Sequence, residues 1–379
     1  MQRLVIYSHD TFGLGNMRRM TAIAEHLVRT HGDLNILLIS GSSALPAFQL
    51  PDRIDYIKLP CLARDAAGRY SPRSLSMALH ELTSLRASLI DAAIRNFAPE
   101  LILVDKKPFG VNGELEPVLR RLRQQVRRPK LVLLLRDILD DPEATRSAWS
   151  RTGYHDAIDA CYEAVLVVGD ARVFDMAKEY AFPASTHRRL RYCGYVNKST
   201  SATATGTAAP DSVLVTPGGG EDGALLVDTY IDALASLPAA SVSHIILGPD
   251  MPAAQATRFE ARLANSSRVI CQRFTTAMDE HMRRASVLVS MAGYNTVYEG
   301  LSLGKRMVVV PRTRPSREQE IRAQRLAQLG SLTCIHPREL TPQRLSAAVC
   351  QALRTSDSGP HLDFDGLANV ERALMEMLP

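Results

Sequence analysis

Short runs of Leu, Val and Ile recur along this chain of 379 residues, and segments with helical character separate them. The first half contains LVIYS, LNILLIS, ELILVDK, KLVLLLRD and AVLVVGD, and the second half contains SVLVTP, SHIILGP, SRVICQRF, SVLVSM and RMVVVPR. Nearly continuous apolar runs of this length are typical of strands that helices cover on both faces, as in a parallel sheet. The pattern therefore predicts an α/β fold with two Rossmann-like, doubly wound sheets.

A segment without apolar periodicity, NKSTSATATGTAAPD, separates the two sets of strands. Its Ser, Thr, Ala and Gly content predicts an exposed linker. We therefore predict an N-terminal domain over residues 1–197, a linker over 198–211, a C-terminal domain over 212–360 and a last helix within 361–379. Two domains of this kind usually close over a ligand.

Composition restricts the class of protein further. With 46% hydrophobic and 22% charged residues, and no apolar stretch near the roughly 20 residues of a membrane-spanning helix, we expect a cytoplasmic globular protein. The six cysteines are scattered without a CxxC pair, which predicts reduced thiols and no zinc site. The basic segments RRLRQQVRRPK and THRRLR are either solvated helix faces or patches that meet phosphates or an anionic membrane.

Ligands of open parallel sheets bind beyond the carboxyl ends of the strands, so the loops there hold the candidate residues. After the first strand comes HDTFGLGNMRR, in which Gly13 and Gly15 allow a tight turn and close backbone approach at the start of a helix predicted from about Leu14 to His31. Arg18 stands where a dinucleotide fingerprint has its third glycine, and no acidic residue follows the second strand. This argues against an NAD-dependent oxidoreductase.

His9 and Asp10 open this first loop. A neutral imidazole at the end of a strand can take a proton from an acceptor hydroxyl, and Asp10 could orient that base or serve as one. The alternative is structural, with His9 hydrogen-bonded within the turn and Asp10 capping the next segment. Both interpretations stay open at the level of sequence.

Two glycine-containing loops follow strands of the second half. In VTPGGGEDGALL, the glycines at positions 218, 219 and 220 could wrap a diphosphate, although Glu221 and Asp222 would repel one unless they point away. In SMAGYNTVYEG, Gly293 provides a turn, and Thr296 and Glu299 have the spacing of a capping box. The competing interpretation puts this helix start on a phosphate and Glu299 on the two hydroxyls of a ribose.

A third loop, TRPSREQEIRAQRLAQLG, follows the strand RMVVVPR. Ser316 and Gln319 again fit a capping box, whereas Glu318 and Gln319 could instead read sugar hydroxyls. We expect Arg317 and Arg322 to face solvent.

Together these segments resemble the donor-binding domain of glycosyltransferase family 28. The resemblance is carried by TPGGGEDG, by QRFTTAMDEHMRRASVLVSMAGYNTVYEGLSLGKRMVVVP and by REQEIRAQRLAQLG, over residues 213–330, with weaker support from FGLGNMRR. It implies a GT-B fold, with two Rossmann-like domains facing a cleft. It further implies an inverting reaction that uses no bound metal and no cofactor, because helix N-termini stabilise the diphosphate leaving group.

The resemblance also implies roles for single residues. Glu299 would bind the donor ribose, the backbone around Arg273 and Phe274 would recognise the base, and Glu318 and Gln319 would contact the sugar. The donor phosphates would be lined by Ser290, Met291, Ala292, Gly293, Asn295 and Thr296, with Gly218, Gly219 and Gly220 as a second phosphate loop and Gly13, Gly15 and Asn16 beside the donor. Asn16 stands where the family commonly has a histidine, which makes His9 the candidate base.

We therefore predict a transferase that moves a sugar from a UDP-sugar to a hydroxyl acceptor. The alternative is a nucleotide-sugar epimerase of the same fold, with acid and base roles among Asp10, Asp105, Glu114 and Glu221. A nucleic-acid-binding protein fits less well, because aromatic content is only 6% and no RNA-binding motif is present. The predicted helix 71–94 and the basic residues 120–128 could meet a lipid-linked acceptor at the inner face of the membrane, or could be ordinary covering helices.

Overall fold

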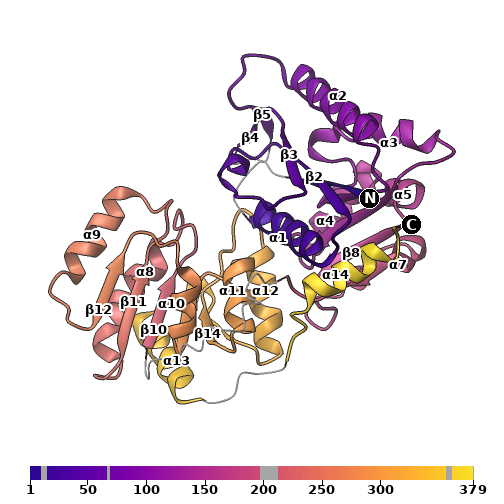
Figure 1. The fold of residues 1–379 in the computed structure, drawn as a ribbon. Coiled ribbons are helices and arrows are strands. Elements are labelled where there is room, and N and C mark those ends of the chain that lie inside the picture. The colour runs from indigo at the N-terminus through magenta and orange to yellow at the C-terminus, as the bar shows by residue number, and fades with distance from the viewer. Residues whose placement is uncertain (10–14, 66–68, 197–211, 356–360, 379) are drawn as a thin grey trace. The chain divides into compact units, whose positions relative to one another are not determined.

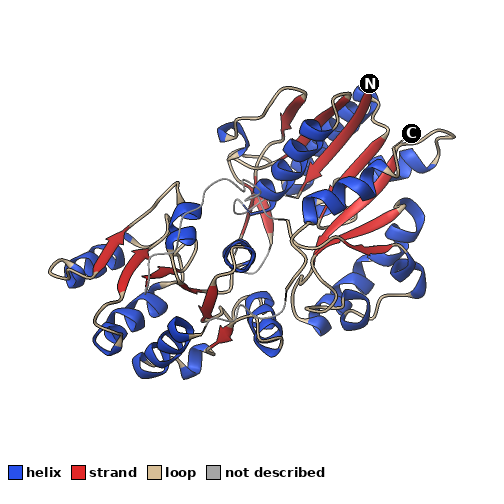
Figure 2. Ribbon diagram, turned by 60° about the horizontal axis from the view of Figure 1, so that its bottom comes forward, coloured by secondary structure: helices blue, strands red, loops and turns tan. Residues whose placement is uncertain are grey.

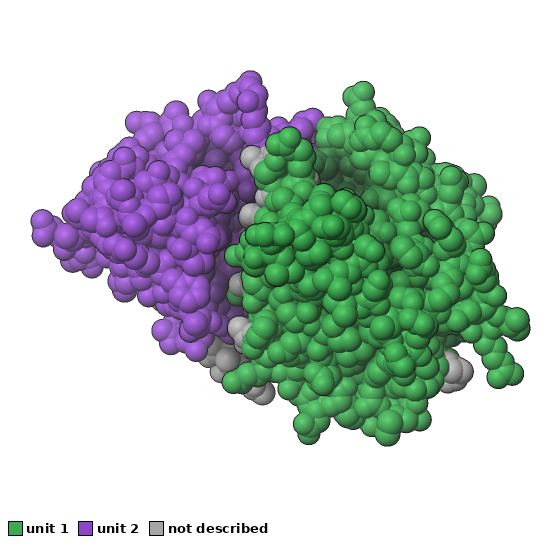
Figure 3. Space-filling view, turned by 90° about the horizontal axis from the view of Figure 1, so that it is seen from above, with its two compact units in different colours: residues 1–196, 363–379 green, residues 197–362 purple. Residues whose placement is uncertain are grey.

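The computed structural model describes residues 1–9, 15–65, 69–196, 212–355 and 361–378. The chain divides into two compact units, which Figure 3 colours separately. Unit 1 comprises residues 1–196 and 363–379, and unit 2 comprises residues 197–362. The predicted linker 198–211 lies outside the described residues.

Unit 1 is built on a seven-stranded sheet with the order β3-β2-β1-β6-β7-β8-β9, in which every neighbouring pair is parallel. Strands β6 and β8 are buried along their whole length, as expected for strands with helices on both faces. Figure 2 shows these helices on either side of the sheet. The strands are β1 (Gln2–Ser8), β2 (Leu34–Ser40), β3 (Ile54–Lys58), β6 (Leu101–Asp105), β7 (Lys130–Arg136), β8 (Ala164–Val168) and β9 (Leu190–Tyr192).

A short antiparallel hairpin, β4 (Leu62–Arg64) and β5 (Tyr70–Pro72), precedes the longest helix of the described chain, α2 (Leu79–Phe97). The prediction of a helix from residue 71 is therefore wrong at its start. The backbone N–H of Ala78 donates to the Glu81 carboxylate at 2.9 Å, which caps the helix where it begins. The other helices of unit 1 are α1 (Gly15–Thr30), α3 (Glu116–Arg123), α4 (Pro142–Thr152), α5 (Tyr154–Cys161), α6 (Met176–Glu179), α7 (Ala184–Arg188) and α14 (Gly366–Met375).

The last helix, α14, packs against α1, as the yellow and indigo ribbons of Figure 1 show. Glu371 on α14 accepts hydrogen bonds from His26 at 2.5 Å and from His31 at 2.8 Å. Partial burial alone would raise the pKa of Glu371, but these histidines lower it overall. The C-terminal helix is thus part of the N-terminal unit.

Unit 2 contains a six-stranded parallel sheet with the order β12-β11-β10-β13-β14-β15. Both sheets confirm the predicted pair of doubly wound domains. The strands are β10 (Ser212–Thr216), β11 (Val242–Ile246), β12 (Val269–Gln272), β13 (Val287–Ser290), β14 (Arg306–Val309) and β15 (Thr333–Cys334). The helices are α8 (Ala224–Ala233), α9 (Ala253–Leu263), α10 (Met278–Arg284), α11 (Tyr294–Ser302), α12 (Glu318–Gln328) and α13 (Pro342–Arg354).

Within the described residues, no helix is long and apolar enough to cross a membrane.

Candidate functional site

The strand order of unit 2 reverses between β10 and β13, which are neighbours in the sheet although β11 and β12 lie between them in sequence. Their register pairs Thr216 with Ser290, the last residue of each strand. The loops that follow, 217–223 and 291–293, therefore leave the sheet side by side. In open parallel sheets a ligand binds in the crevice at such a switch point.

The glycine loop after β10 has positive φ angles and packs closely against the turn that follows β11. Gly218 and Gly220 have φ angles of +89° and +99°, and a Cβ on Gly220 would lie 2.4 Å from the Leu247 carbonyl oxygen. The Gly219 carbonyl accepts a hydrogen bond of 2.8 Å from the Asp250 N–H. By contrast, a Cβ on Gly218 would meet no described atom within 4 Å. The loop is thus fixed on one side and open at Gly218.

The two carboxylates of this loop are exposed to solvent. Asp222 forms an ion pair with Arg312, from the loop after β14, at 3.4 Å. The pair offsets part of the negative charge that would otherwise oppose a phosphate at the glycine loop.

Helix α11 begins at Tyr294, and its N-cap is Gly293, which has no side chain to cap the first turn. The structure therefore excludes the capping box, one of the two interpretations that the sequence leaves open: Thr296 lies inside the first turn and Glu299 in the second. The helix starts earlier because Ala292 turns the backbone with a φ of +37°. First-turn N–H groups that no side chain caps are a ready site for an anion.

The residues predicted to line the phosphates differ in their exposure. Ser290 and Ala292 are fully buried and Met291 is nearly so, which leaves their side chains without access to a donor. Gly293, Asn295, Thr296 and Glu299 are partly exposed at the start of α11.

Helix α12 begins at Glu318 with Arg317 at the N-cap, so Ser316 and Gln319 do not form the predicted capping box. Instead, the Gln319 carbonyl oxygen accepts a hydrogen bond of 3.1 Å from the Arg312 N–H, and the Ser316 hydroxyl accepts one of 3.2 Å from the Glu318 N–H.

The expectation that Arg322 faces solvent is also wrong, because its side chain is 0% exposed. It donates to the Glu318 carboxylate at 2.6 Å and to the Ala292 carbonyl at 3.0 Å. Sequence reasoning missed this residue, since one of its partners lies 30 positions away.

Arg273 and Phe274, predicted to recognise the base, follow β12 at the carboxyl edge of the sheet. The Phe274 ring is 55% exposed, and Arg273 pairs with Glu260 on α9 at 2.7 Å. The rings of His244 on β11 and His281 on α10 lie edge to face, with their centroids 4.3 Å apart. Burial, together with the nearby His281, lowers the pKa of His244 below its ordinary value.

In unit 1 the strand order reverses between β1 and β6, and His9 directly follows β1. His9 is 2% exposed, and its Nε2 lies 3.5 Å from the Tyr70 hydroxyl of β5. The Asn16 amide, in the first turn of α1 next to Gly15, donates to the His9 carbonyl at 2.9 Å. Asp10 and Gly13 lie outside the described residues.

Two carboxylates considered as acid or base groups of an epimerase are held in buried ion pairs. Asp105 pairs with Arg19 at 2.8 Å, and Glu114 accepts hydrogen bonds from Arg86 at 2.5 and 2.7 Å and from the Tyr7 hydroxyl at 2.6 Å. Both carboxylates are 0% exposed, so neither is open to a sugar. Within the described residues, no group of three or more His, Cys, Asp or Glu side chains could hold a metal ion.

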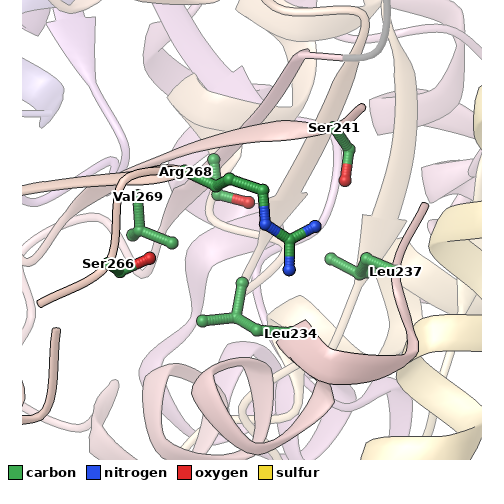
Figure 4. A pocket seen from close by; sticks show the side chains of 7 residues that line it. Leu234, Leu237, Ser241, Ser266, Arg268 and Val269 are labelled. Carbon is green, nitrogen blue, oxygen red and sulfur yellow. The ribbon is translucent and has the colours of Figure 1, made fainter. Parts of the chain in front are cut away.

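A small pocket of unit 2 lies away from these loops (Figure 4). The pocket lies at the starts of β11 and β12, which is the amino edge of the sheet. Ligands of this sheet type bind at the opposite, carboxyl edge. We therefore do not assign the donor to it. The lining residues are Leu234, Leu237, Ser241, Ser243, Ser266, Arg268 and Val269.

Residues 213–360 match the family model of the glycosyltransferase family 28 C-terminal domain. Unit 2 therefore carries a glycosyltransferase family 28 C-terminal domain, and the chain as a whole has the fold of GT-B glycosyltransferases. The match begins in the first strand of unit 2 and includes every loop of unit 2 described above. It confirms the predicted resemblance.

Solved structures of glycosyltransferases that match this chain over nearly their whole length show the same fold. MurG of Acinetobacter baumannii has a TM-score of 0.66 at 14% identity, covering 99% of this chain and 100% of its own. The glycotransferase of kitacinnamycin has a TM-score of 0.65 at 14% identity, with coverage of 100% and 99%. UDP-glucose:anthocyanidin 3-O-glucosyltransferase in complex with UDP has a TM-score of 0.63 at 13% identity, with coverage of 100% and 98%. A comparison with curated proteins gives no match to this sequence.

Proposed function

We propose that this glycosyltransferase moves a sugar from a UDP-sugar to a hydroxyl group of an acceptor, with inversion at the anomeric carbon and without a bound metal ion. The observation that carries the proposal is the start of α11, which has no side-chain cap and lies beside the glycine loop at the switch point of unit 2. A helix N-terminus carries roughly half a positive charge, which suits the diphosphate that leaves in this reaction. The structure of a similar enzyme in complex with UDP supports the choice of nucleotide.

In the proposed reaction the acceptor oxygen attacks the anomeric carbon while the bond from that carbon to the diphosphate breaks. The acceptor proton passes to His9, and UDP leaves with the bonding electrons. The first-turn N–H groups of α11 and the open Gly218 would hold the phosphates. Glu299 would accept hydrogen bonds from the ribose, and Glu318 and Gln319 would meet the sugar.

Calorimetry with UDP tests the nucleotide site. Hydrogen bonds to a charged group contribute about 1.5–3 kcal/mol, so Glu299→Ala should weaken UDP binding roughly 10- to 150-fold. Glu143→Gln, at an exposed position of α4 in unit 1, is the control and should bind like wild type. Equal affinity of wild type and Glu299→Ala would refute the ribose assignment.

A transfer assay tests the base. Removing a positioned general base lowers a rate by about 10²- to 10⁴-fold, so His9→Gln should lower kcat while UDP affinity stays unchanged. Rapid epimerisation of the UDP-sugar in the absence of acceptor would instead support the epimerase alternative.

A further inference from the structure

Arg322 contacts both parts of the proposed donor site. These are the start of α11, where we place the phosphates, and the start of α12, where we place the sugar. Its guanidinium is fully buried and contacts Ala292, Glu318 and two aromatic rings. The guanidinium carbon lies 5.4 Å from the ring centre of Tyr294 and 5.8 Å from that of Tyr298. A cation at these distances from aromatic faces is attracted by them. One side chain of α12 thus holds the first turns of α11 and the residue before its N-cap.

The hydrogen bond to Ala292 has a consequence for the next amide. Ala292 has a φ of +37°, a conformation that a residue other than glycine adopts only when its surroundings impose it. Its carbonyl points at the Arg322 Nη1, 3.0 Å away. In a planar trans peptide the C=O and the following N–H point in opposite directions, so the Gly293 N–H is directed away from Arg322. A Cβ on Gly293 would meet no described atom within 4 Å, so the Gly293 Cα borders open space.

The second hydrogen bond fixes a carboxylate. Arg322 Nη2 donates to Glu318 Oε1 at 2.6 Å across one helical turn, and Glu318 keeps 17% of its side chain exposed. The guanidinium fork can bind a carboxylate and a carbonyl at once in a fixed geometry, whereas the single ammonium of lysine fixes neither direction. The same side chain therefore sets the direction of the Gly293 peptide and of the Glu318 carboxylate.

We infer that Arg322 is a positioning residue of the donor site, which aims the Gly293 N–H at the donor diphosphate and Glu318 at the donor sugar. The inference rests on the proposed function and adds to it a buried residue that touches no substrate. It predicts that loss of the guanidinium fork weakens recognition of the diphosphate, while contacts to the uridine part of the donor persist.

The test compares Arg322→Lys and Arg322→Met with wild type for UDP by calorimetry, and for uridine by ligand-observed NMR. We expect both variants to lose roughly 10- to 100-fold in UDP affinity and to keep the uridine affinity of wild type. Arg325→Lys, on the same helix, should change neither. Leu345→Ala serves as a second control, since Leu345 is buried in the core of unit 2 on α13 and truncating it destabilises the unit without removing a hydrogen bond to Ala292 or Glu318.

The outcomes separate the two hypotheses. If wild type binds UDP and the Arg322 variants bind it equally well, the positioning role is overturned and the proposed function stands. If Leu345→Ala, at equal loss of stability, weakens UDP binding as much as Arg322→Lys, the effect is one of stability and the positioning role is again overturned. If wild type binds no UDP, the proposed function fails first and the inference fails with it.

Discussion

Alanine substitutions at two glycines of the loop after β10 and at one glycine outside it distinguish the effect of backbone strain on stability from the effect of a lost ligand contact on binding. Gly220, Gly218 and Gly304 all have positive φ angles, of +99°, +89° and +65°. Alanine in this region costs about 1–2 kcal/mol, and about 0.4–1 kcal/mol of that is offset because alanine restricts the unfolded chain. For Gly218→Ala and Gly304→Ala, whose new methyl groups would meet no described atom within 4 Å, the net loss of unfolding free energy should be about 1 kcal/mol.

Gly220→Ala should be more destabilising than the other two variants. Its Cβ would lie 2.4 Å from the Leu247 carbonyl oxygen and 3.1 Å from the Met251 nitrogen, and these are backbone atoms that cannot rotate away. Overpacking of this kind adds about 1–3 kcal/mol, which gives a total of about 2–4 kcal/mol. Urea unfolding followed by circular dichroism measures the difference. Tryptophan fluorescence would miss it, because the only tryptophan, Trp149, lies in unit 1.

Binding should follow a different order from stability. The Gly218 methyl would occupy the open side of the loop, where we place a phosphate, whereas Gly304 follows α11 outside the loops of the site. We expect UDP affinity to fall at least roughly tenfold in Gly218→Ala and to stay unchanged in Gly304→Ala, although the two lose similar stability. Equal UDP affinity in these two variants would show that the glycine loop does not contact the donor.

The remaining predictions concern pH and membranes. Because the pKa of His244 is lowered in the folded protein, the unfolded chain binds the extra proton first; stability should be full above about pH 6.5 and fall as the pH drops from there towards the lowered pKa. Urea unfolding between pH 5 and 7.5 should show a shallower pH dependence in His244→Gln, and an unchanged slope would contradict the assignment. On α2, Leu85 and Leu89 are exposed one turn apart, and α2 packs on α3, whose last turn carries Arg120 and Arg123. We expect the chain to sediment with anionic vesicles at low salt and to be released at high salt; no sedimentation would leave these as ordinary covering helices.

The central strands of both sheets were predicted from the sequence, because strands buried on both faces require continuous apolar runs. The short edge strands β3, β9 and β15, and the strand order that creates the switch points, were not predicted. The loops at the carboxyl ends of the central strands were predicted as well, since position in a parallel sheet identifies them without side-chain detail. What the sequence could not show is the register of the helix starts. Thr296 and Glu299 have the capping spacing, but the turn at Ala292 starts α11 two residues before Thr296.

Buried charges were the other failure, and for a physical reason. Arg322 donates a hydrogen bond to a carbonyl 30 residues earlier in the chain. Glu114 accepts hydrogen bonds from Arg86, 28 residues away, and from Tyr7, 107 residues away. Local patterns treat an arginine on an amphipathic helix as exposed, because burying it unpaired is unfavourable. Only tertiary structure shows which distant groups accept hydrogen bonds from it.

The loops at the carboxyl edge of unit 2 form one connected framework. Asp222 of the glycine loop pairs with Arg312, whose backbone N–H donates to Gln319 at the start of α12. One residue earlier on α12, Glu318 accepts from Arg322, which also holds Ala292 before α11. The first turn of α12 is therefore joined to both phosphate loops and to the sugar side of the proposed site. Substitutions in contacting residues of one network are not additive, so the energetic roles of these loops are measured by double-mutant cycles through α12 and not by single variants alone.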